Sequence, residues 1–232
     1  MLTVKLDHRL TKFARILPFF LCTITLAYLF GQYLKLYMGW DTAKGFIPLF
    51  DMDDEGNIPA WFSASLFLLC AVSLQFIALY QKSQHAPYVK HWQGLCWIFI
   101  FLSMDEASQI HEKTIKPLRN LLHVQQGILY FTWVIPGAIF VLIMIYFYYK
   151  FIMSLPTQTK FYFLVSAGLY VLGALGMELI QGYYASQYGF NNIRFVILVT
   201  LEEVLENSGI IVFFYGLSQY IESKGPYINF GP

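Results

Sequence analysis

Long apolar runs dominate this chain and constrain its fold more than any other feature. A helix needs about 20 apolar residues to cross a bilayer, and six segments of the sequence reach about that length. They cover residues 14–37, 60–81, 93–112, 128–151, 161–184 and 195–221. Only 12% of the residues are charged, whereas soluble domains carry about 25% charged residues. We therefore predict an all-α fold, a polytopic membrane helix bundle with about six transmembrane helices.

Turn-forming residues separate these runs, because glycine and proline punctuate regular structure. They are Gly39, Gly45, Pro48, Pro59, Pro87, Pro117, Pro156, Gly189, Asn191 and Asn192. No low-complexity segment interrupts the chain, so we predict a single transmembrane domain over residues 1–232, with an outer loop at about 39–59. The acids Asp51, Asp53, Asp54 and Glu55 of this loop resemble an acidic cation-binding loop, but they lack the full spacing and the terminal bidentate glutamate of a calcium-binding loop. We interpret the loop as solvated, lying on the membrane surface or capping the bundle.

The distribution of Lys and Arg indicates the orientation in the membrane, because cytoplasmic loops carry an excess of both. With the N-terminus inside and six spans, nine Lys and Arg residues fall on the inner side and six on the outer side. We therefore predict that both termini are cytoplasmic. We expect an integral protein of a bacterial inner (plasma) membrane. The net charge of +1 gives no support for nucleic-acid binding.

Acidic residues inside the apolar runs mark the candidate functional site. Residues 103–112 and 201–207 each contain three acids, and Glu178 lies between them in sequence. Charged side chains at membrane depth are costly and usually face the bundle interior or a water-filled cavity. A rise of about 1.5 Å per residue places His111, Glu178 and Glu203 about 27–31 Å from the predicted inner face. Three helices should therefore bring these residues into one layer near the outer boundary.

Acids at this density cannot all stay ionised unless a cation joins them or some hold protons. Carboxylates with one imidazole suit zinc, iron or manganese, and oxygen ligands alone suit calcium or magnesium. We predict a site for a divalent metal (zinc, iron, manganese or calcium). The candidate ligands are Asp105, His111, Glu112, Glu178, Glu203 and Glu206. Glu106 and Glu202 are the candidate catalytic residues. The alternative is that these side chains hold the helices together by hydrogen bonds, or that His111 and Glu112 lie at the outer interface.

Three functions fit this pattern. The first is a metal-dependent membrane enzyme that acts on a lipid-like or quinone-like substrate near the outer leaflet. The second is a cation or proton transporter that uses the same acids as a relay. The third is an accessory or assembly subunit with a polar structural core. The lipid bilayer is the expected partner in each case, and a protein partner or a homo-oligomer stays open.

Overall fold

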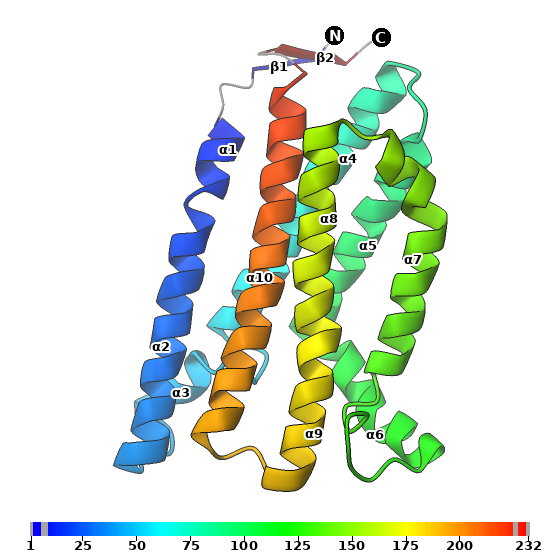
Figure 1. Cartoon of the computed structure of the whole chain (residues 1–232). Helices are drawn as coiled ribbons and strands as arrows, with labels where there is room; N and C mark the ends of the chain where they lie inside the picture. The colour runs from blue at the N-terminus through cyan, green and yellow to red at the C-terminus, as the bar shows by residue number, and fades with distance from the viewer. Residues whose placement is uncertain (1, 6–8, 225–226, 231–232) are drawn as a thin grey trace.

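The structure is a computed structural model that describes residues 2–5, 9–224 and 227–230. It is a bundle of long helices that run side by side (Figure 1). The long helical segments are α1 (Arg9–Ala14) with α2 (Leu17–Met38), α4 (Ile58–Ser83), α5 (Val89–Ser108), α7 (Val134–Ser154), α8 (Thr157–Val171) continued by η2 (Leu172–Met177) and α9 (Glu178–Tyr188), and α10 (Ile193–Glu222). The shorter elements are η1 (Ala43–Gly45), α3 (Phe46–Leu49), α6 (Ile110–Leu122), β1 (Leu2–Lys5) and β2 (Tyr227–Phe230).

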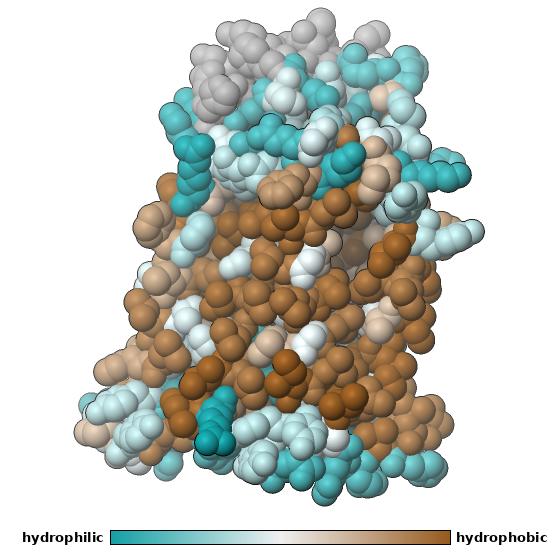
Figure 2. Space-filling view, in the orientation of Figure 1, coloured by the Kyte–Doolittle hydropathy of each residue, from teal (hydrophilic) through white to brown (hydrophobic). Residues whose placement is uncertain are grey.

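The prediction of a helix bundle with membrane-spanning helices is confirmed in outline. Within the described residues, four helical stretches are long and apolar enough to cross a membrane, fewer than the six predicted. They are Arg9–Met38, Ile58–Ser83, Val134–Ser154 and Thr157–Tyr188. The other two long helices, α5 and α10, are 20 and 30 residues long but carry the acidic patches. The face shown in Figure 2 is apolar over its middle and polar toward both ends, as expected where helices contact lipid.

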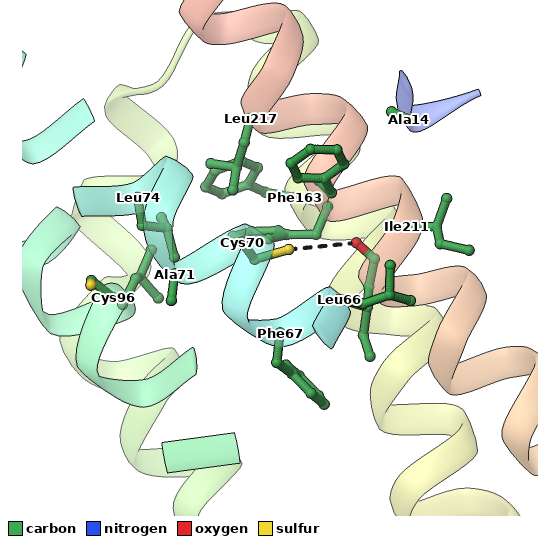
Figure 3. Close-up of a cluster of buried hydrophobic side chains, with 14 of the residues drawn as sticks. Ala14, Leu66, Phe67, Cys70, Ala71, Leu74, Cys96, Phe163, Ile211 and Leu217 are labelled. Atoms are coloured by element: carbon green, nitrogen blue, oxygen red, sulfur yellow. Dashed lines mark hydrogen bonds between the residues drawn. The ribbon is translucent and has the colours of Figure 1, made fainter. Parts of the chain in front are cut away.

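Helix α10 holds the bundle together, because it packs against α2, α4, α8 and η2. Cys70 lies at the centre of the apolar core, among Leu66, Phe163 and Leu217 from α4, α8 and α10 (Figure 3). Its thiol donates a weak hydrogen bond to the carbonyl of Ile210, with an S···O distance of 3.8 Å. Side chains from three helices therefore fix the middle of the bundle by close packing.

The paired strands β1 and β2 and the connection from α2 to α4 lie at opposite ends of the bundle (Figure 1). Strand β1 pairs antiparallel with β2, which places both ends of the chain together. The connection from α2 to α4 folds over the other end, where Ile47 and Met52 are buried. Asn57 secures it: its Nδ2 donates to the carbonyl of Asp51 at 2.6 Å, and its Oδ1 caps α4 at the Ala60 N–H, 3.2 Å away.

The helix predicted over residues 93–112 is wrong at its C-terminal end. Helix α5 stops at Ser108, and Gln109 adopts a left-handed conformation with φ of 54°. A left-handed residue interrupts a helix and is unusual for a residue other than glycine. The carboxylate of Asp105 accepts the backbone N–H of His111 at 2.9 Å and so satisfies an amide at the start of α6. His111 and Glu112 therefore belong to a separate, amphipathic helix, and their expected depth along the third helix is also wrong.

Candidate metal centre

A cavity of about 760 Å³ lies among α5, α7, α8, η2 and α10 and holds the candidate functional site. All eight residues selected from the sequence line it, together with three acids of the α2–α4 connection. They are Asp105, Glu106, His111, Glu112, Glu178, Glu202, Glu203 and Glu206, with Asp53, Asp54 and Glu55 from the connection. Helices that are far apart in sequence therefore converge on one space, at the end of the bundle opposite β1 and β2.

The imidazole of His111 is oriented by Asp105. Its Nδ1 lies 2.8 Å from one carboxylate oxygen of Asp105, and the other oxygen accepts the His111 backbone N–H. The turn at Gln109 makes this contact because it folds the start of α6 back toward the last turn of α5. In the neutral imidazole, an N–H from Nδ1 to a carboxylate leaves Nε2 as the unprotonated nitrogen, which is the arrangement of most metal-binding histidines.

Glu55, His111 and Glu112 form the group with metal-ligand spacing in the part of the chain that the structure describes. One ligand atom from each lies within 4.8 Å of the other two. Zinc ligands lie about 2.0–2.2 Å from the ion, so small side-chain rotations would bring all three onto one cation. The buried Oε2 of Glu55 accepts no hydrogen bond from any described residue. An unpaired buried oxygen is costly, and a cation would satisfy it.

Sequence reasoning missed Glu55. The acids of residues 51–55 looked like those of a solvated loop, and only the folding of this connection over the bundle end brings Glu55 to α6. The apolar residues of the same loop were an available signal, because they indicated that the loop packs against the membrane surface or caps the bundle. Among the sequence-predicted ligands, the structure groups His111 and Glu112 with Glu55, while Asp105 contacts His111.

Electrostatics favour a cation or bound protons at this group. Burial and the negative charges of Glu106 and Glu112 raise the pKa of Glu55 to about 8. Burial alone would lower the pKa of His111, but the hydrogen bond and charge of Asp105, with Glu55 and Glu112, raise it to about 9. In the absence of metal the group therefore holds protons near neutral pH. A divalent cation can replace those protons, because it compensates the same negative charges.

The remaining acids line the cavity beside this group but do not share its ligand spacing. Glu178 accepts the indole N–H of Trp133 at 2.7 Å, and the Trp133 ring lies 4.6 Å from that of His111. Gln181 donates to Glu202. Residues 172–177 form a π-helical turn immediately before Glu178, a feature often found at functional sites. Glu178 is therefore linked through Trp133 to the group Glu55, His111 and Glu112, which we call the candidate metal group, or metal group for short.

Glu203 and Glu206 face the cavity from α10. Asn207 donates to Glu203 Oε2 at 3.3 Å and itself accepts the hydroxyl of Ser63 at 3.0 Å. Glu106 interacts electrostatically with both glutamates. These acids thus form a second polar cluster that lines the same cavity.

Apolar and aromatic side chains line the rest of the cavity. They come mainly from α5, α7 and α8 and include Phe99, Met144, Tyr148, Ile152 and Phe163. The cavity is therefore amphipathic, with carboxylates and one imidazole at one end and a long apolar space beyond them.

The chain was also compared with known proteins. A sequence model of the family described as Domain of unknown function (DUF8692) matches residues 17–220. No curated protein and no solved structure matches the chain.

Proposed function

The chain belongs to the DUF8692 family, whose description gives no activity, and from the site we propose a metal-dependent membrane enzyme that acts on a lipid-like substrate. One observation carries the proposal: the group Glu55, His111 and Glu112 lies at the polar end of an otherwise apolar cavity. Ligand sites are typically apolar pockets of about 300–1,000 Å³ with a few convergent polar groups. This cavity has that composition and that size.

In this proposal Glu55, His111 and Glu112 hold a divalent cation, and Asp105 fixes the imidazole. Zinc, iron, manganese and calcium are the candidates, and the imidazole favours the first three. A cation held by three protein ligands keeps a position open and can activate water or polarise a substrate oxygen. Glu106 and Glu202 line the same cavity and are the candidates for proton transfer, a role that positioned carboxylates take.

We further propose six membrane spans with both termini cytoplasmic, in a bacterial inner membrane. The acids of α5 and α10 line the cavity rather than a lipid-facing surface, so these two helices can also cross a bilayer. Strands β1 and β2 lie at the end of the bundle opposite α6, which carries His111 and Glu112 (Figure 1), so the site would lie near the outer leaflet. An impermeant maleimide should label Asp54→Cys from outside the cell and fail to label Ala86→Cys. The reverse labelling pattern would refute this orientation.

Metal analysis of the purified protein tests the proposal. After incubation with zinc, iron, manganese or calcium and removal of excess ion, the parent should retain one of them in stoichiometric amount. His111→Gln and Glu55→Gln should lose it. His85→Gln and Asp41→Asn are matched controls, because both side chains are exposed and lie outside the cavity. Metal at 100 times its Kd should stabilise the parent by about 2.7 kcal/mol. A parent that retains no metal and gains no stability would refute the metal site.

A structural accessory subunit is the second candidate, and the hydrogen bonds of Gln181 to Glu202 and of Asn207 to Glu203 favour it. Such amide–carboxyl contacts hold helices together in membranes. Absence of metal in the parent protein would favour the accessory subunit over the enzyme. The geometry gives less support to a transporter. A relay would need acids along the whole cavity, but none of the described lining residues of α7 and α8 is acidic.

A further inference from the structure

We propose that the cavity takes a long-chain lipid with an amino head group, which enters sideways from the bilayer between α7 and α8. The inference deepens the proposed function, since the head group would lie beside the metal group. Three features of the described residues carry it: the length of the apolar part, its opening toward lipid, and the charge of its polar end.

The apolar part of the cavity is long enough for an extended acyl chain. On α7 the lining runs from Gly137 to Met153, which is about 24 Å at 1.5 Å per residue. The hydrocarbon core of a bilayer is about 30 Å thick. The space therefore extends through most of the depth that a lipid chain occupies. A compact polar metabolite would leave that apolar length unfilled.

The cavity opens toward lipid along the side of α7 that faces α8. Met153 and Leu164 line the cavity but remain 43% and 52% exposed, and Phe140, Ile145 and Tyr149 are likewise both lining and exposed. A recess is visible between the upper parts of α7 and α8 in Figure 2. The surface below it is apolar in Figure 2, and polar side chains lie above it. A lipid chain could therefore pass from the apolar surface into the cavity.

Helix α7 is fixed at both ends, so the opening is a lasting feature of the fold. At one end Trp92 of α5 stacks edge-on against Phe151, with ring centroids 4.9 Å apart. At the other end the hydroxyl of Thr132, just before α7, donates to the carbonyl of Ile115 at 2.9 Å. Between these contacts most of the α7 surface is exposed. The helix thus stands off from α5 and α8 and leaves the apolar space between them.

The charge of the polar end selects the head group. Ten acids line the described cavity, against two permanently charged cations, Lys116 and Arg119. Arg119 is already engaged, because its Nη2 donates to the carbonyl of Tyr130 at 2.8 Å and its guanidinium lies over the Tyr130 ring. One divalent cation compensates only two of these acids. An amino group can donate hydrogen bonds to the remaining carboxyl oxygens, whether they are ionised or protonated, whereas an anionic head group would be repelled by those that are ionised.

Photo-crosslinking tests the inference. The probes are a long-chain primary amine with a diazirine in mid-chain and a long-chain phosphate of the same length. The amine should crosslink cavity residues such as Met144 and Tyr148, and the phosphate should not. Ala167→Phe fills the cavity, since Ala167 lines it and is exposed, and should lose most of this labelling. Gly168→Phe is the control, because Gly168 does not line the cavity and a Cβ added there meets nothing within 4 Å.

The outcomes separate this inference from the metal site. Crosslinks confined to lipid-facing positions such as Tyr146, equal labelling by both probes, or full labelling of Ala167→Phe would each overturn the inference. Thermal unfolding shows whether the variant is folded, and the probe comparison in the parent does not depend on it. Ala167→Phe should keep the metal, and His111→Gln should lose the metal but keep the mid-chain crosslinks. If the amine probe labels cavity residues in a parent protein that retains no metal, the proposed enzyme is refuted and the lipid-binding site is still supported.

Discussion

Asp105→Asn is the sharpest test of how the metal group is organised. Both carboxylate oxygens of Asp105 are used, one by His111 Nδ1 at 2.8 Å and the other by the His111 backbone N–H at 2.9 Å. Asparagine has one acceptor oxygen and one NH2 donor. If its oxygen keeps the backbone N–H, its NH2 group faces Nδ1. Nδ1 must then accept a hydrogen bond, so the proton moves to Nε2 and blocks the nitrogen that would bind metal.

The expected loss of metal affinity in Asp105→Asn follows from what hydrogen bonds that orient a metal-binding histidine contribute. Loss of the partner that orients a metal-binding histidine typically weakens metal affinity about 10–100-fold, or about 1.4–2.7 kcal/mol. The assay is a metal titration against a competing chelator, with parent and variant in the same detergent. Thermal unfolding in chelator should show that the variant remains folded. Asp41→Asn, a change of the same kind at an exposed residue, is the control. A Kd for Asp105→Asn equal to that of Asp41→Asn would refute the orienting role.

Three further predictions concern stability in chelator, measured by thermal unfolding. Glu206→Gln should keep or raise stability, because it removes one of several like charges. Asn207→Ala should cost about 1–3 kcal/mol by leaving buried partners unpaired, and equal effects of the two changes would contradict this distinction. Gly173→Ala should cost about 1–3 kcal/mol by overpacking, because a Cβ there would lie 2.6 Å from Cγ of Glu206. A Cβ added at Gly168 meets nothing within 4 Å, so Gly168→Ala should hold or raise stability. A loss of stability equal to that of Gly173→Ala would contradict the overpacking argument. Burial and neighbouring acids raise the pKa of Glu55 to about 8, so the folded state holds a proton that the unfolded state releases at lower pH. Stability should therefore fall as pH rises from about 5 to 8, and an unchanged slope in Glu55→Gln would show that another group is responsible.

The sequence predicted the class of fold because hydrophobic length is a local property of the chain. Runs of about 20 apolar residues leave a helix as the simplest way to satisfy the backbone in lipid. Helix ends were harder to predict. The left-handed turn at Gln109 is held by the Asp105 carboxylate, which accepts the backbone N–H of His111. No glycine or proline marks that turn in the sequence.

The acids that line the cavity from the helices were selected for a similar physical reason, since a charge at membrane depth must find a polar space. Their grouping was not accessible in this way. Glu55 and Glu112 come together because the α2–α4 connection folds over α6, and Ile47 and Met52, which anchor that connection, find their packing partners only in the bundle. Long-range packing of this kind leaves no fixed spacing in the sequence.

The amino-acid sequence by itself determined that this chain forms apolar helices and which of their residues carry charge that must be compensated. The tertiary structure alone decided that Glu55 joins His111, that Asp105 orients the imidazole, and that α7 stands apart to leave an apolar space. The physical reason is that hydrophobicity and charge are properties of each residue along the chain. The distance between a loop carboxylate and an imidazole, in contrast, exists only after several helices have packed.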